Sequence, residues 1–179
     1  SCPHTVLVGR DSEIPDIQYP CFLKPVGAVS HRYNEFKFKI CKDRKHLQKT
    51  LQRVRADSVF LLQQFIKTEM DLLVYGARLP DGQTVFGGTL FVDRRSDTGS
   101  ASHGYIQSGI PETVGEEKLI RFLDTIDYHG LFSFEFGIMD GTPYFYEVNL
   151  RNDGTSHFYW QAGANLPLIY VYACAGEDW

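Results

Sequence analysis

The chain has 179 residues, of which 43% are hydrophobic, so it can bury one mid-sized core or two small ones. Its 18 basic and 22 acidic residues give a net charge of −4, which argues against a nucleic-acid or anionic membrane partner. No apolar run approaches the roughly 20 residues that span a bilayer, and the four cysteines are widely spaced. We therefore expect a soluble, cytoplasmic protein with reduced thiols.

The first elements in chain order are a strand, a helix and a second strand. Residues 21–25 form a short apolar run that ends at Lys24, followed by a loop over residues 26–34. The spacing of Leu47, Leu51 and Val54 predicts an amphipathic helix over residues 43–56 with Asp43 as its N-cap. Residues 58–66 are again apolar and predict a buried strand.

A hairpin comes next, with strands over residues 70–78 and 84–93 joined by the turn at residues 80–82. The polar stretch 93–104 predicts a mobile loop that could act as a flap. Apolar periodicity then predicts a helix over residues 114–128.

The remaining segments are a second hairpin, a loop or short helix and a final helix. Residues 155–163 are polar and aromatic, and residues 166–175 are apolar enough to form a helix. The order of all these elements predicts an α+β fold with antiparallel sheets.

The second hairpin, residues 132–151, places acidic residues opposite each other. If residues 140–142 form an odd, three-residue loop, residue i pairs with residue 282 minus i, and Glu135 faces Glu147. Phe132, Phe134, Phe136, Ile138, Tyr144, Tyr146, Val148 and Leu150 then share one side of the hairpin, and Ser133, Glu135, Glu147, Asn149 and Arg151 share the other. An even loop would divide the apolar set between both sides.

Directly opposed carboxylates repel unless a cation or a shared proton lies between them. Oxygen ligands favour a hard ion, and Mg²⁺ typically takes one or two protein carboxylates together with water and substrate phosphates. The hairpin therefore predicts a metal site that receives a phosphate-bearing substrate. The alternative is a half-exposed hairpin whose acids point into water.

Four patches together resemble the ATP-grasp family, in particular its carbamoyl phosphate synthase-like members and amino-acid carboxylate–amine ligases. The patches are residues 19–25 (YPCFLKP), residues 62–66 (LQQFI) followed by Asp71, residues 134–137 (FEFG) and residues 147–151 (EVNLR). The resemblance implies two α+β lobes with antiparallel sheets that enclose a nucleotide cleft. Residues 1–66 would form the smaller lobe with the hinge strand, and residues 67–179 the larger lobe with the metal-site hairpin.

The resemblance also implies roles in nucleotide binding. Lys24 matches the lysine on the α- and β-phosphates of ATP, where a compact point charge suits the ligand; a lysine that merely ends an edge strand is the alternative. Gln64, Phe65 and Ile66 match the hinge that reads adenine, although Glu is the commoner residue at the first position. Asp71 matches the acid on the ribose, with Glu69 as a competing candidate and a solvated loop acid as the alternative for either.

The remaining matches concern the metal and the transferred phosphoryl group. Glu135, Glu147 and Asn149 match ligands of Mg²⁺ or Mn²⁺. Arg151 matches the arginine that reaches the phosphoryl group, which makes Arg151 and Lys24 the candidate catalytic residues. Arg78 and His103 are weaker candidates for phosphate or substrate contact, and an exposed arginine and a solvated histidine are their alternatives.

The implied function is an ATP- and Mg²⁺-binding region of a ligase that activates a carboxylate as an acyl phosphate for attack by an amine, forming a C–N bond. Its partners would be the two small substrates, and a homo-oligomer is compatible with this function. The family's other nucleotide-binding lysine would precede residues 3–5, so we expect a fragment of a longer protein that lacks an N-terminal region and could lack a C-terminal one. The alternatives are a non-catalytic nucleotide sensor or assembly module and a purely structural interaction domain.

Overall fold

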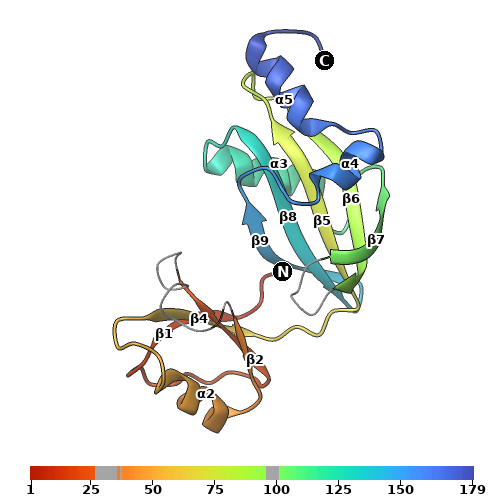
Figure 1. Cartoon of the computed structure of the whole chain (residues 1–179). Helices are drawn as coiled ribbons and strands as arrows, with labels where there is room; N and C mark the ends of the chain where they lie inside the picture. Colours follow the sequence, from red (N-terminus) through yellow and green to blue (C-terminus); the bar gives the residue numbers. More distant parts are fainter. Residues whose placement is uncertain (27–35, 37, 96–100) are drawn as a thin grey trace. The chain divides into compact units, whose positions relative to one another are not determined.

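The structure is a computed structural model that describes residues 1–26, 36, 38–95 and 101–179. It divides into two compact units (Figure 1). The smaller unit spans Cys2–Lys67, and the larger unit contains Thr68–Trp179 together with Ser1. Of the predicted loop over residues 26–34, only Val26 lies within the described residues.

The described residues of the smaller unit form a four-stranded antiparallel sheet with one helix. Its strand order is β1-β4-β2-β3. The elements are β1 (Thr5–Gly9), β2 (Cys21–Pro25), β3 (Lys39–Cys41), α2 (Arg44–Leu51) and β4 (Val59–Gln64). The sequence analysis did not predict β1 or β3, which are short strands at the two edges of this sheet.

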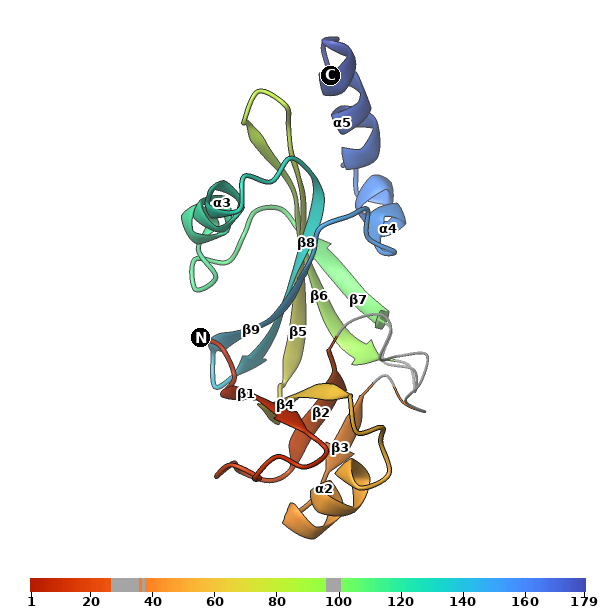
Figure 2. The ribbon, with the colours of Figure 1, turned by 90° about the vertical axis from the view of Figure 1, so that its left-hand side faces the viewer.

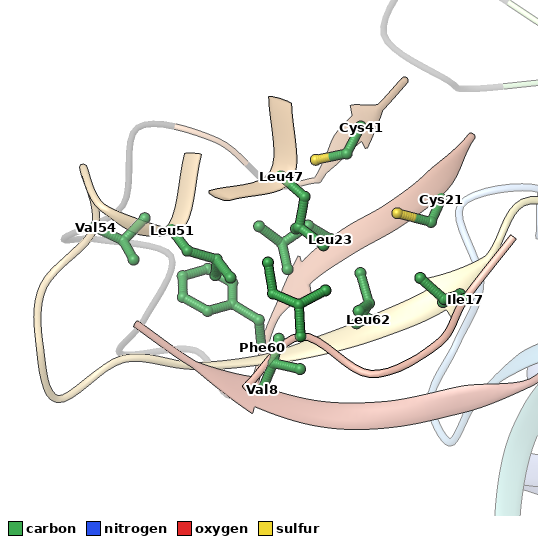
Figure 3. Packing of buried hydrophobic residues seen from close by; sticks show 11 residues of the cluster. Val8, Ile17, Cys21, Leu23, Cys41, Leu47, Leu51, Val54, Phe60 and Leu62 are labelled. Atoms are coloured by element: carbon green, nitrogen blue, oxygen red, sulfur yellow. The ribbon is translucent and has the colours of Figure 1, made fainter. Parts of the chain in front are cut away.

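The core of the smaller unit is apolar and includes two free cysteines (Figure 3). Leu47 and Leu51 of α2 are buried beside residues of β2 and β4. Asp43 caps the helix as predicted, because its Oδ1 accepts a hydrogen bond of 2.7 Å from the amide of His46.

Helix α2 ends at Leu51, five residues before the predicted end. The amides of Arg53 and Val54 bond to carbonyls three residues back instead of four, so the chain tightens and leaves the helix. Val54 is nevertheless buried in the core. Its apolar spacing therefore reports burial but not helical structure.

Within its described part, the larger unit is a five-stranded antiparallel sheet with three helices. Its strand order is β7-β6-β5-β8-β9. The elements are β5 (Met70–Arg78), β6 (Thr84–Arg95), β7 (Ala101–Gln107), α3 (Glu116–Thr125), β8 (Gly130–Met139), β9 (Thr142–Asn149), α4 (Ser156–Gln161) and α5 (Leu166–Ala175). The predicted α+β class with antiparallel sheets is confirmed.

Helices cover both faces of the larger sheet (Figure 2). On one face of the sheet, Leu119 and Leu123 of α3 pack with the phenylalanines of β8. We call this face the phenylalanine face. On the other face, Tyr159 of α4 and Leu166 of α5 pack on residues of β5 and β6. The acidic residues of the hairpin lie on this second face, which we call the acidic face.

The predicted flap at residues 93–104 is wrong where the structure describes it. Strand β6 continues to Arg95 and β7 begins at Ala101, and the two pair through Arg95 and Ala101; residues 96–100 lie outside the described part. The small and polar residues of β7 lie on an edge strand, where one side of the backbone has no strand partner and an apolar alternation is not required. None of the helices within the described ranges has the length and apolar character needed to cross a membrane.

Candidate functional site

The β8–β9 hairpin opposes Glu135 and Glu147 by a different route from the predicted one. Its turn has two residues, Asp140 and Gly141, both with positive φ (49° and 69°), so the predicted three-residue loop is wrong. Asp-Gly is a favoured pair for such a turn, because both residues must adopt left-handed backbone. The two-residue turn alone would place Tyr146 opposite Glu135.

A β-bulge at Tyr146 restores the register. Phe136 pairs with Phe145, but Glu135 pairs with Glu147, so one extra residue stands in β9 between these pairs. The bulge also changes the predicted apolar set, because Phe145 and not Tyr146 packs with Val148 in the core of the phenylalanine face. Tyr146 instead lies over Gly137, at the position that a Cβ atom on this glycine would occupy.

Asn149 contacts Glu135, one of the two opposed carboxylates on the acidic face. Its Nδ2 donates hydrogen bonds to Glu135 Oε1 at 3.1 Å and to Ser133 Oγ at 3.4 Å. Its Oδ1 accepts a bond of 3.1 Å from Arg151 Nη2. Neighbouring strands thus bring together Glu135, Glu147, Asn149 and Arg151, as the hairpin pattern predicts.

A buried acid, Asp153, is linked to Asn149 through the hydroxyl of Ser133. Ser133 Oγ donates to Asp153 Oδ2 at 2.8 Å, and both residues are almost completely buried. Burial opposes ionisation of Asp153, but hydrogen bonds from the hydroxyl and amide of Thr155 outweigh it and hold the pKa of Asp153 below its ordinary value. The ionised form of Asp153 is therefore favoured, and it fixes the hydroxyl of Ser133 as a donor to its carboxylate.

Arg95 connects Glu135 to Asp71. Its Nε donates to Asp71 Oδ2, and its Nη2 lies 3.8 Å from Glu135 Oε2. Asp71 also accepts a hydrogen bond of 3.2 Å from Thr68 Oγ1. Glu69, the competing ribose candidate, accepts instead from the amide of Asp140 at the hairpin turn.

The electrostatics of Glu135 favour a cation. Burial and then the nearby Glu147 raise the pKa of Glu135 above its ordinary value, and Arg95 opposes this only in part. The donor set of two carboxylates and one amide oxygen suits Mg²⁺, which binds few protein carboxylates and completes its shell with water and phosphate oxygens. No group of three or more His, Cys, Asp and Glu side chains suited to a metal occurs among the described residues.

The other predicted nucleotide residues belong to the smaller unit. Lys24 is exposed on β2, with Leu61 of β4 as its partner. Gln64 ends β4, and its Nε2 donates to Gln18 Oε1 at 3.4 Å. Phe65 packs on Phe22 with ring centroids 5.1 Å apart, and Ile66 is buried. The backbone of this segment leaves the sheet directly after Gln64.

The two weaker candidates have other partners. Arg78 donates to Thr84 Oγ1 at 2.6 Å and also pairs with Asp124. It stands at the opposite end of β5 from Asp71. His103 lies on β7, where its Nδ1 is 2.7 Å from Asp93 Oδ1.

Sequence reasoning missed three residues that organise the acidic face: Arg95, Ser133 as a link, and Asp153. Ser133 was placed on the correct side, but a serine carries no signal for its partner. Asp153 follows the EVNLR patch by two residues, and Arg95 was assigned to a loop. A pattern that marked buried polar residues near opposed carboxylates would have found Ser133 and Asp153.

Comparisons with solved structures identify the fold. The chain superposes on N5-carboxyaminoimidazole synthetase from Staphylococcus aureus complexed with ADP with a TM-score of 0.75 and 16% identity, covering 99% of this chain and 48% of that one. For L-amino acid ligase from Bacillus licheniformis the TM-score is 0.71 at 16% identity, with 96% and 42% covered. For a biotin carboxylase–ATP-analogue complex from Campylobacter jejuni it is 0.72 at 16% identity, with 90% and 38% covered.

No protein-family profile and no curated protein matches the sequence. The chain spans less than half the length of each of the three solved structures. The agreement in three dimensions nevertheless shows that the chain has the ATP-grasp fold, which confirms the resemblance seen in the four sequence patches.

Proposed function

We propose that this chain is the ATP- and Mg²⁺-binding region of a ligase that joins a carboxylate to an amine. The observation that carries the proposal is the opposition of Glu135 and Glu147 on one sheet face, with Asn149 bonded to Glu135 and Arg151 bonded to Asn149. Two acids in such contact need a cation, and a phosphate-rich nucleotide supplies the remaining ligands of Mg²⁺.

In the proposed reaction a carboxylate oxygen attacks the γ-phosphorus of ATP, and the bond to the β-phosphate oxygen breaks to release ADP. The amine then attacks the carbonyl carbon of the acyl phosphate, and inorganic phosphate leaves. Mg²⁺, when bound, would neutralise charge on the β- and γ-phosphates. Glu135, Glu147 and Asn149 would hold the ion.

Arg151 and Lys24 would act on the phosphates themselves. The guanidinium of Arg151 is oriented by Asn149 and by the carbonyl of Asn152 at 3.0 Å, so its remaining donors can meet charge that spreads over the transferring phosphoryl oxygens. We assign Lys24 to the α- and β-phosphates, Gln64, Phe65 and Ile66 to adenine, and Asp71 to the ribose.

Melting temperature in the presence of nucleotide tests the proposal. ATP with Mg²⁺ should stabilise the chain, by about 2.7 kcal/mol at a hundredfold excess over Kd, and either component alone should have much less effect. Glu147→Gln should abolish the joint effect. Glu117→Gln, an exposed change on α3, is the matched control and should retain it.

Protection that needs no Mg²⁺, or that survives Glu147→Gln, would contradict the metal assignment. Release of ADP from the full-length protein that depends on an acceptor would distinguish a ligase from a nucleotide sensor. A sensor would bind ATP and Mg²⁺ without this release.

A further inference from the structure

A cavity of about 490 Å³ lies in the larger unit between the edge of the sheet and α4. Its strand side is formed by Leu90 and Val92 of β6 with Gly104 and Ile106 of β7. Its helix side is formed by Phe158 and Ala162 at α4. In both views α4 lies beside β6 and β7 (Figures 1 and 2). The volume is in the range of small-molecule sites.

Strand register places this cavity on the acidic face. Glu147 pairs with Glu135, Glu135 with Leu73, Leu73 with Leu90, and Leu90 with Ile106. Partners in an antiparallel sheet point to the same face, so this row places the cavity on the face of the opposed acids, with the buried Leu73 between them. Neighbouring strands are about 4.8 Å apart, which puts Leu90 roughly 10 Å from Glu135.

A second row leads to the same conclusion. Asp71 pairs with Val92 on one side and with Gly137 on the other, and Val92 pairs with Gly104. Asp71, which contacts Arg95 in the candidate site, is therefore one strand from a wall of the cavity. Gly104 adds no side chain, and a Cβ there would lie 2.3 Å from the Phe91 carbonyl oxygen.

The lining of the cavity is mostly apolar. Leu90 and Val92 are buried, whereas Phe158 is 50% exposed although its ring lines the cavity. Ser102, His103 and Gln161 also line it, and His103 is paired with Asp93. An apolar group would remove Phe158 from water, whereas a charged group buried among these side chains would lose its hydration and meet only these few polar groups.

We propose that this cavity binds the apolar side chain of the carboxylic acid that the ligase activates, so that the substrate class is acids with a bulky aliphatic or aromatic group. The inference rests on the proposed function, because the acid's carboxylate must reach the phosphoryl group at Arg151 while its side chain lies on the same sheet face. The span of roughly 10 Å between strands β8 and β6 suits a small organic acid.

The test uses the full chain with ATP, Mg²⁺ and hydroxylamine, which attacks an acyl phosphate to give a hydroxamate and phosphate and so does not require the natural amine. The acids compared are small (acetate, glycine), charged (glutamate) and bulky apolar (leucine, phenylalanine, phenylpropionate). We expect kcat/KM to be at least about tenfold higher for the bulky apolar acids.

The variant Ala162→Phe narrows the cavity from an exposed position, and Ala175→Phe, equally exposed at the end of α5, is its control. Ala162→Phe should raise KM for the bulky acids about tenfold while changing kcat little and sparing acetate. The control should change neither value. Equal losses for all acids, or a preference for glutamate, would overturn the inference while leaving the proposed reaction intact.

Binding of the same acids, followed by ligand-observed NMR, separates the two proposals. The cavity assignment would be supported and the reaction refuted if apolar acids bind the native chain, bind Ala162→Phe more weakly, and give no hydroxamate with either. Absence of any binding preference for apolar acids would refute the cavity assignment whether or not turnover occurs.

Discussion

Strand β8 points Phe132, Phe134 and Phe136 to one face of the sheet and Ser133, Glu135 and Gly137 to the other. The phenylalanine face is covered by α3 and packed with aromatic rings 5.4–6.3 Å apart around Phe134. The acidic face carries linked polar groups, one of them a carboxylate whose pKa is raised by burial. Adjacent residues of one strand thus contribute to two different surfaces, a packed aromatic core and a polar cluster.

The largest effect on this contrast should come from Phe134→Ala. Phe134 is 1% exposed, and removing its ring leaves a cavity, so we expect a loss of about 3–5 kcal/mol in the free energy of unfolding. Urea denaturation measures it. Phe158→Ala, which removes a half-exposed ring of α4, should cost less than about 0.5 kcal/mol. Similar losses in both variants would mean that the two faces share the burden of stability.

Arg151→Lys should produce the converse result. The lysine keeps the charge but loses the planar fork that Asn149 orients, so we expect kcat of the full-length protein to fall about 10²–10³-fold. The urea midpoint should stay within the error of the native chain, because Arg151 is exposed. A matching fall in stability would show that Arg151 is a structural residue.

Tyr159→Phe tests how α4 is attached to the acidic face of the sheet. The Tyr159 hydroxyl donates to the Leu73 carbonyl at 2.6 Å and accepts from the Leu90 amide at 3.2 Å, so it bridges β5 and β6. Its removal leaves buried backbone groups without this partner, and we expect a loss of about 1–3 kcal/mol. Hydrogen exchange of the Leu90 amide should accelerate in the variant, whereas amides of α3 should change less.

The smallest effect should come from Asp124→Asn. Asp124 pairs with Arg78, but its side chain is 50% exposed, and such ion pairs contribute about 0–1 kcal/mol. The difference between variant and native chain should shrink further in 0.5 M salt, which thermal denaturation can follow. A loss that salt does not reduce would indicate that Arg78 depends on Asp124 for its packing and not for its charge.

The residues that the sequence could predict are those whose local pattern also fixes their surroundings. Strand β5 and helix α5 have the predicted ends, and the acidic residues of the hairpin lie on one face as the alternation requires. The ATP-grasp fold followed from four short patches. In each case the information lies within a few residues of sequence.

The remainder depended on contacts between distant segments. Strand β7 has no apolar alternation and becomes a strand by pairing with β6. Arg95 acquires its meaning only from Asp71, 24 residues earlier, and Asp153 from Ser133, 20 residues earlier. The turn was mistaken because a two-residue turn with a bulge and a three-residue turn without one give the same opposition of Glu135 and Glu147.

Because the bulge compensates for the short turn of the hairpin, the effect of deleting one residue of β9 depends on which residue is removed. Removing Tyr146 would straighten β9 yet leave Glu147 across from Glu135, since the surplus residue is the one lost. Removing Val148 instead would put Asn149 and Arg151 out of phase with both glutamates and turn them toward the aromatic core. The hairpin therefore tolerates loss of one residue at the bulge before Glu147 but not after Glu147.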